Sequence, residues 1–150
     1  MFGDEESLAI CEHFKRLRRL SFRCCDLTKI PPCVKTLTCL EAIDLCGNEL
    51  VGSQLPSALT LARLTELRVS HLDDDFLFVP LHAIRPLSGL VLLEIAEKLN
   101  ERTVGIVRRL APALRELRLC QGAINGLDSV HALVVLAQAL PKVHIDIYQT

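Results

Sequence analysis

One apolar pattern recurs six times along the chain. Its clearest copy is LEAIDLCGNEL, from Leu40 to Leu50, and the copies begin at residues 17, 40, 64, 90, 114 and 140. Successive copies are therefore 23 to 26 residues apart. In every copy the first, fourth and sixth places hold an apolar residue. A period of this length predicts a solenoid, in which each copy is one structural unit and neighbouring units share a continuous core.

The spacing within a copy predicts a short β-strand. The fourth and sixth places are two residues apart, so both side chains point to one face of a strand while the fifth points to the other. Successive strands in such a repeat run parallel and are joined by a returning segment. We therefore expect an α/β protein whose sheet has one core face and one open face. The eighteen core positions are Leu17, Leu20, Phe22, Leu40, Ile43, Leu45, Leu64, Leu67, Val69, Leu90, Leu93, Ile95, Leu114, Leu117, Leu119, Leu140, Val143 and Ile145.

The returning segments of the later copies show helical signals. Asp128 and Ser129 precede VHALVVLAQAL, in which Val130, Leu133, Val134 and Leu140 fall at helical spacing before Pro141. This predicts a helix with a capping side chain at its start and a proline at its end.

Two other helices and two short turns are expected among the connectors. Asn100 precedes ERTVGIVRRL, which predicts a second helix, and Pro80 to Leu90 predicts a shorter third one interrupted at Pro86. The earlier connectors, residues 31–39 and 51–63, carry prolines and are expected to hold only a turn or two.

The two ends of the repeat region differ. Residues 5–16 place Leu8, Cys11 and Phe14 on one helical stripe, which predicts an N-terminal capping helix packed on the first copy. After the sixth copy, Val143, Ile145 and Ile147 alternate with no polar cap. That edge is expected to associate with itself or with a neighbouring subunit, to continue in a longer protein, or to remain as a short frayed end.

Composition argues against several kinds of partner. The 150 residues form one domain by length, with 17 basic and 18 acidic side chains and a net charge of −1. No run of five or more like charges and only six aromatic residues are present, so we expect no nucleic-acid partner. The longest mainly apolar run, Ala132 to Leu140, is too short to span a membrane, and Phe2 to Glu6 is acidic where a signal peptide would be basic.

The reactive residues do not form a recognisable catalytic or metal motif. The seven cysteines are odd in number and contain no CxxC pair, so we expect reduced thiols in an intracellular protein, cytoplasmic or nuclear. The five histidines fall on different predicted elements, and the glycines occur singly. We therefore expect a protein that is not an enzyme, with no catalytic residue, metal or cofactor.

The chain resembles the leucine-rich-repeat family over about residues 5 to 150. Leu40 to Leu50 matches the LxxLxLxxNxL consensus at every defined position, with Asn48 where the family has an asparagine that bonds backbone groups at the turn. Cys25 fills the alternative cysteine place in the first copy. The same place in the other copies holds Leu72, Lys98, Gly122 and Tyr148, which depart from the pattern.

The resemblance implies a right-handed curved solenoid of about six repeats that binds a protein partner. Its parallel sheet would line the concave face and its short helices the convex face. The repeat length and the helical connectors look intermediate between the short intracellular class and the longer class of ribonuclease inhibitors and ubiquitin-ligase substrate receptors, although the first sixteen residues contain no F-box. The alternatives to a binding module are thus a structural subunit of a larger assembly and the substrate-recognition part of a ubiquitin-ligase-type complex.

The open sheet face is the first candidate site. The fifth places of the six copies hold Ser21, Asp44, Arg68, Glu94, Arg118 and His144. Four of them should form a ladder of alternating charge, because neighbouring strands lie about 4.8 Å apart. Either these charges satisfy one another, or a protein with complementary groups docks there. The adjoining candidates are Arg19, Arg23, Glu66, Ser70 and Glu116.

The second candidate site is the loop from residue 71 to residue 80. Its candidate contacts are His71, Asp73, Asp74, Asp75, Phe76 and Phe78. The loop either protrudes and binds a partner, or its aspartates cap the next helix while a phenylalanine turns inward. The acidic run lacks the alternate ligands, glycine and distal glutamate of a calcium loop, so no metal is expected there.

Overall fold

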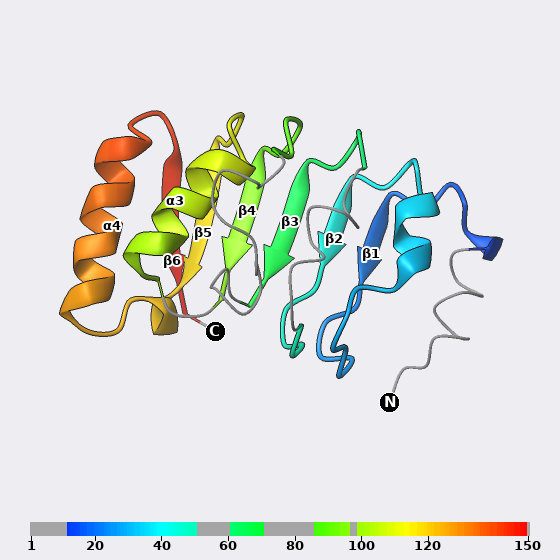
Figure 1. Ribbon diagram of the computed structural model, residues 1–150, viewed down its shortest axis with the longest axis horizontal. Coiled ribbons are helices and arrows are strands. Elements are labelled where there is room, and N and C mark those ends of the chain that lie inside the picture. The colour runs from blue at the N-terminus through cyan, green and yellow to red at the C-terminus, as the bar shows by residue number, and fades with distance from the viewer. Residues whose placement is uncertain (1–11, 51–60, 71–85, 97–98, 150) are drawn as a thin grey trace.

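The computed structural model describes residues 12–50, 61–70, 86–96 and 99–149. Six parallel strands form one sheet in chain order, as Figure 1 shows. The α/β class and the parallel sheet predicted from the repeat are confirmed. The strands are β1 (Arg19–Ser21), β2 (Ala42–Asp44), β3 (Glu66–Val69), β4 (Leu92–Ile95), β5 (Glu116–Cys120) and β6 (His144–Tyr148).

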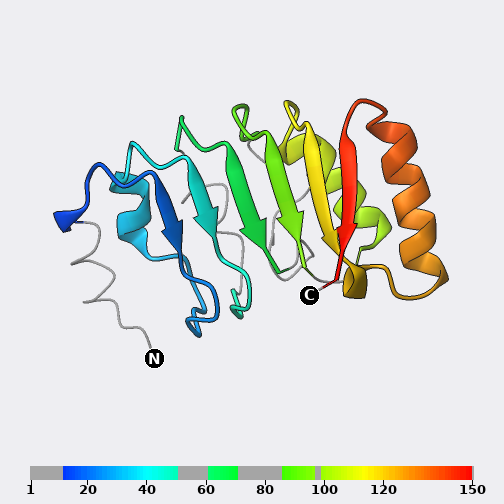
Figure 2. The same cartoon turned by 180° about the vertical axis from the view of Figure 1, so that it is seen from behind.

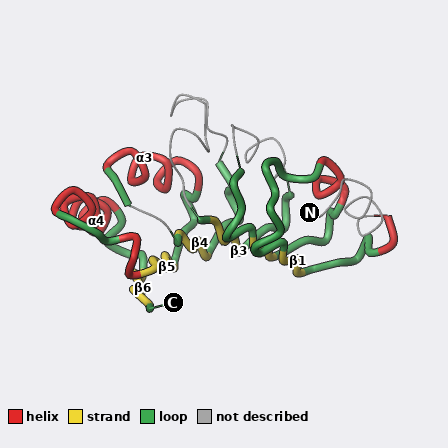
Figure 3. The backbone as a smooth tube through the Cα atoms, turned by 90° about the horizontal axis from the view of Figure 1, so that it is seen from below, coloured by secondary structure: helices red, strands yellow, loops and turns green. Residues whose placement is uncertain are grey.

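The described helices lie on one face of this sheet. They are η1 (Pro32–Thr36), α3 (Glu101–Leu110), η3 (Gln121–Ala123) and α4 (Leu127–Ala139). Figure 3 shows α3, α4 and η1 on the same side of the strands, and Figure 2 shows the strands from the other side. Within the described ranges, no helix crosses that second face, which we call the open face.

A repeated backbone hydrogen bond sets the register of the copies. The second residue of each copy donates its N–H to the carbonyl of the second residue of the copy before. These bonds run from Glu41 to Arg18 (2.8 Å), Thr65 to Glu41 (2.8 Å), Val91 to Thr65 (2.9 Å) and Arg115 to Val91 (2.9 Å). The first five copies therefore stack with the spacing that the sequence predicts.

The eighteen predicted core positions all face the covered side of the sheet. Thirteen are buried, whereas Leu17, Leu20, Leu140, Val143 and Ile145 are partly buried. These five lie in the first and last copies. Each interior copy is covered by a neighbouring copy on both sides, and burial of this apolar surface is the main contribution to the stability of the fold.

The predicted register of the sixth copy is wrong. Strand β6 pairs Leu117 with Ile145 and Arg118 with Asp146, so Asp146 rather than His144 occupies the fifth place. The predicted register would put Pro141 at the second place, where every earlier copy donates a backbone N–H. Proline has no N–H. Instead, His144 donates to the carbonyl of Arg115 at 2.8 Å.

Asn48 holds the turn after β2, as the family resemblance implies. Its Oδ1 accepts hydrogen bonds from the N–H groups of Cys25 and Leu27, both at 3.0 Å. Its Nδ2 donates to the carbonyls of Phe22 (2.7 Å) and Leu45 (2.9 Å). One buried side chain thus satisfies backbone groups in two successive copies.

The turn that contains Asn48 repeats the backbone shape of the turn before it. Gly47 has φ +70°, and Cys24, at the same place one copy earlier, has φ +53°. Glycine adopts this left-handed conformation without strain, whereas a side chain at position 47 would also meet Cys24 Sγ.

The two predicted helices of the later copies form, with different starts. Asn100 caps α3 in a capping box with Thr103, whose N–H lies 2.9 Å from Asn100 Oδ1, so that prediction is confirmed. Helix α4 begins after Gly126 without a side-chain cap. Asp128 and Ser129 lie inside its first turn, because Leu127 is already helical.

The predicted buried stripe of α4 is also wrong in part. Ser129, Ala132 and Leu136 are buried, whereas Val130 and Val134 are about half exposed, at 47% and 49%. Leu133 and Leu140 are partly buried. The helix is apolar on several sides, so the sequence pattern alone does not select the side that meets the sheet.

The shorter connectors follow the prediction where they are described. Residues 31–39 hold the single helical turn η1. Residues 51–60, the segment 80–85 of the third expected helix, and Leu8 and Cys11 of the N-terminal helix lie outside the described residues. At the N-terminal end, Phe14 is 57% exposed, so the prediction that it packs on the first copy is wrong. In the described part of the predicted helix, only residues 12 and 13 are helical.

The cysteines depart from the expectation at one position. Cys24, Cys25, Cys39, Cys46 and Cys120 are free thiols. Cys33, which is buried within η1, is disulfide-bonded. The prediction that every cysteine is reduced is therefore wrong for Cys33.

Candidate binding site on the open face

Two rows of side chains cross the open face. The third places of the copies align as Arg19, Ala42, Glu66, Leu92, Glu116 and His144. The fifth places align as Ser21, Asp44, Arg68, Glu94, Arg118 and Asp146. The sheet therefore brings together the charged residues predicted from the repeat, with Ala42 and Ser21 as the small residues among them.

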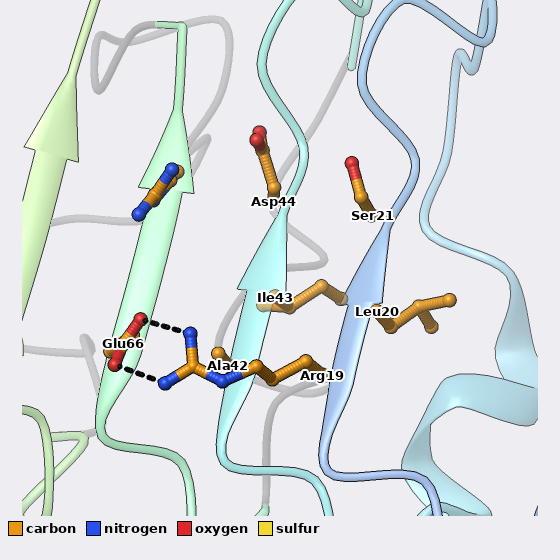
Figure 4. Close-up of a pocket in the computed structure, with 8 residues that line it drawn as sticks. Arg19, Leu20, Ser21, Ala42, Ile43, Asp44 and Glu66 are labelled. Atoms are coloured by element: carbon orange, nitrogen blue, oxygen red, sulfur yellow. Dashed lines mark hydrogen bonds and ion pairs between the residues drawn. The ribbon is translucent and has the colours of Figure 1, made fainter.

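A hollow of about 250 Å³ opens where these small residues lie, across β1, β2 and β3. It is lined by Arg19, Leu20, Ser21, Ala42, Ile43, Asp44, Glu66 and Arg68. Because Ala42 and Ser21 have short side chains, their longer neighbours form a rim around a low floor (Figure 4). The rim carries two cationic and two anionic side chains.

Arg19 and Glu66 form one side of the rim and reach toward each other over β2. The Arg19 guanidinium donates to both carboxylate oxygens of Glu66, at 3.0 and 3.3 Å (Figure 4). The small side chain of Ala42 leaves room for this contact between strands that are not neighbours. The Arg19 side chain is 71% exposed, so the pair contributes only about 0 to 1 kcal/mol to stability and a partner can displace it at little cost.

Asp44 forms the opposite side of the rim. Its Oδ1 accepts the N–H of Cys46 at 3.0 Å, and its Oδ2 lies 3.8 Å from the Arg23 guanidinium. These contacts fix the carboxylate at the end of β2. Burial of the Cys46 thiol, followed by the nearby carboxylates of Asp44 and Glu94, raises its pKa to about 12.

The predicted charge ladder forms at only one of its steps. Arg68 lies 3.5 Å from Glu94 on the next strand, as expected. Asp44 pairs with Arg23 instead of Arg68, and Arg118 bonds Glu116 on its own strand at 2.6 Å. That bond raises the pKa of Arg118. Contacts along a strand thus compete with contacts between strands.

Glu94 is buried, although it was expected to be exposed. Only 5% of the surface of Glu94 is exposed, and its Oε1 accepts a hydrogen bond at 2.8 Å from the hydroxyl of Tyr148 on β6. Burial and this bond to a carboxylate raise the pKa of Tyr148 above its ordinary value. Glu94 is therefore held by Arg68 and Tyr148 and is not available to a partner.

Ser70 and His144 also differ from the prediction. Ser70 is buried, and its hydroxyl accepts the N–H of Gly47 at 2.6 Å, so it supports the turn rather than the surface. His144 lies on the open face, exposed and opposite Glu116, but at the third place. Arg19, Arg23, Asp44, Glu66, Arg68, Glu116 and Arg118 lie on or beside the open face as expected.

The sequence prediction missed two residues that shape the open face. Ala42 forms the floor of the hollow, and Tyr148 covers Glu94. Aligning the third places of the copies would have revealed Ala42 between Arg19 and Glu66. Tyr148 could not be found in this way, because the register of its copy differs from the one predicted. The candidate loop residues His71, Asp73, Asp74, Asp75, Phe76 and Phe78 lie outside the described residues.

The described residues show neither a metal cluster nor a membrane-spanning helix. In these ranges, no group of three or more His, Cys, Asp or Glu side chains is placed to hold a metal ion. No helix in the same ranges has the length and apolar content needed to cross a bilayer.

Comparison with known proteins gives no match. No protein-family model, curated protein or solved structure is similar to this chain. Its function must therefore be inferred from its own residues.

Proposed function

We propose that this protein is a leucine-rich-repeat module, without catalytic activity of its own, that binds a protein partner on the open face. The hollow over Ala42 is the observation that carries the proposal. It combines a low floor with a rim of both charges, on the face that no described helix covers. We place the centre of the interface there.

Three features support the leucine-rich-repeat architecture. The copies are joined by one repeated backbone bond, the described connectors lie on one face, and Asn48 bonds backbone groups of two copies from a buried position. Each arises from the repeat in the sequence. A solenoid of this kind presents its strand faces as an extended binding surface.

The charge pattern favours a protein over other partners. Arg19 and Arg68 alternate with Asp44 and Glu66 around the hollow, whereas a polyanion such as RNA requires one sign throughout. The hollow is open and small, whereas sites for small molecules are enclosed and measure about 300 to 1,000 Å³. A partner with its own charged groups can exchange ion pairs with this rim, which gives specificity.

Photocrosslinking from the floor of the hollow tests this proposal. Ser21 would be replaced by a photoreactive benzoylphenylalanine, and the chain would be irradiated in native lysate. A matched control carries the same group at Arg108, which is exposed on α3. We expect a discrete crosslinked protein from position 21 and none from position 108. Equal labelling from both positions, or none from position 21, would contradict the proposal.

A further inference from the structure

Exposed apolar side chains are concentrated at the β6 end of the sheet. Five large apolar residues are exposed in the described part of the chain, and four of them lie here: Leu127, Val130 and Val134 on α4, and Ile147 on β6. Leu127 is the most exposed of them, at 88%. Contiguous exposed apolar surface marks an interaction site.

The apolar residues of α4 point away from the rest of the molecule. Leu127, Val130 and Val134 are spaced by three and four residues, so they share one side of the helix. His131 reaches back to Glu101 at the start of α3, with 3.5 Å between Nε2 and Oε1. The buried residues of α4, Ser129, Ala132 and Leu136, lie on the opposite side of the helix, so the stripe faces away from the sheet.

The neighbouring strand β6 pairs with β5 on one side, and no described strand pairs with its other edge. Its position is last in the order of the described strands. His144 donates its N–H to the carbonyl of Arg115, the residue before β5, and hydrogen bonding alternates along a parallel strand. Ile145 and Ile147 therefore direct their N–H and C=O groups outward. An edge of this kind pairs readily with another strand.

We propose that the surface formed by β6 and the outward stripe of α4 docks a second copy of this chain, with the two β6 strands antiparallel and centred on Ile145. This pairing places His144 of each copy opposite Asp146 of the other on the open face. On the core face it places Val143 opposite Ile147. The strand is thus complementary to itself, with an imidazole opposite a carboxylate on one face and apolar side chains opposite each other on the other face.

The alternative registers are less favourable. Centring the pair on Asp146 would put the two Asp146 carboxylates opposite each other, which is destabilising. Centring it on Ile147 would leave Ile145 opposite Gln149. Figure 3 shows α4 on the covered side of the sheet, so pairing about Ile145 places the α4 helices of both copies on the same side of the joined sheet.

A charge-exchange cycle tests the register. In sedimentation equilibrium, the 150-residue chain should be a dimer whose dissociation constant rises at least about tenfold in Asp146→Lys and in His144→Glu, since the first removes the carboxylate that faces each His144 and the second puts like charges opposite one another twice. The double variant His144→Glu/Asp146→Lys restores opposite charges and should recover dimerisation. Thermal melting of each variant at low concentration would check that the monomer stays folded.

A second pair of variants tests the helix stripe. Val134→Glu should weaken the dimer, whereas Thr28→Glu, which adds the same charge at an exposed position after β1 at the other end of the sheet, should leave it unchanged. A chain that is monomeric at all concentrations overturns the proposal, even if another protein binds this surface. A dimer unaffected by Asp146→Lys also overturns it, because the copies would then meet elsewhere.

Discussion

Asn48 has the largest structural role of any single polar side chain described. It is 5% exposed and bonds backbone groups on both sides of the turn after β2. An unsatisfied buried polar group costs about 1 to 3 kcal/mol, which is more than a satisfied hydrogen bond contributes. The energetic importance of the asparagine therefore comes from the groups that its removal would leave unpaired.

Replacing Asn48 by alanine should lower the free energy of unfolding by about 3 kcal/mol or more, because several buried backbone groups lose their partner together. Urea denaturation followed by circular dichroism would measure this loss. Asn125→Ala is the matched control, since Asn125 is exposed, and it should change stability by less than about 0.5 kcal/mol. Equal effects of the two changes would show that Asn48 does not hold the turn.

Cys46 should make stability depend on alkaline pH. Its pKa is raised from 9.0 to about 12 in the folded protein by burial and by the nearby carboxylates of Asp44 and Glu94. The folded state thus keeps the thiol protonated where the unfolded state ionises. This contribution is fully present below pH 9 and is lost as the pH rises from 9 toward 12.

Denaturation between pH 7 and pH 10.5 would measure this effect. The Cys46→Ala variant should lose less stability over this range than the parent chain. The buried thiol should also react with iodoacetamide far more slowly than the exposed Cys24. Identical pH profiles for the variant and the parent would contradict the assignment.

At the scale of elements, sequence signals located α3 and α4 but identified the cap of only one. Asn100 precedes a helix whose apolar residues lie on one side, so the start of α3 is unambiguous. Helix α4 contains apolar residues on several sides, and an aspartate inside its first turn resembles a cap. Packing against α3 and the sheet, which the local sequence does not encode, decides where α4 begins and which side it buries.

The two helix starts should respond differently to alanine. Asn100→Ala removes the bonds of the capping box and should lower the unfolding free energy by about 1 kcal/mol. Asp128→Ala removes only a favourable charge in the first turn of α4 and should cost about 0.5 kcal/mol or less. Thermal melting monitored at 222 nm would compare them. A larger loss for Asp128→Ala would mean that Asp128, not Asn100, is the important cap.

At the scale of the whole molecule, the apolar repeat was sufficient to predict the parallel sheet, its strand order and its core face. It failed in the sixth copy, where Pro141 cannot supply the backbone bond that sets the register. The candidate site was predicted less completely. Position within a copy showed which side chains lie on the open face, but Glu94 and Ser70 are removed from the surface by contacts with Tyr148 and Gly47. Such contacts depend on side-chain length and on residues distant in sequence.

The binding affinity of an Ala42→Trp variant tests the central claim most directly. Tryptophan at this position displaces the Arg19–Glu66 pair that lies over the buried Ala42 and fills the hollow over β1 to β3, so stability should fall by about 1 to 3 kcal/mol. The probe is the protein crosslinked from position 21, and Arg108→Trp on α3 is the control. We predict that calorimetric titration gives a dissociation constant at least about tenfold higher for Ala42→Trp and unchanged for Arg108→Trp, because the filled hollow excludes the partner's side chains. An unchanged dissociation constant for a folded Ala42→Trp variant would contradict the proposed binding site.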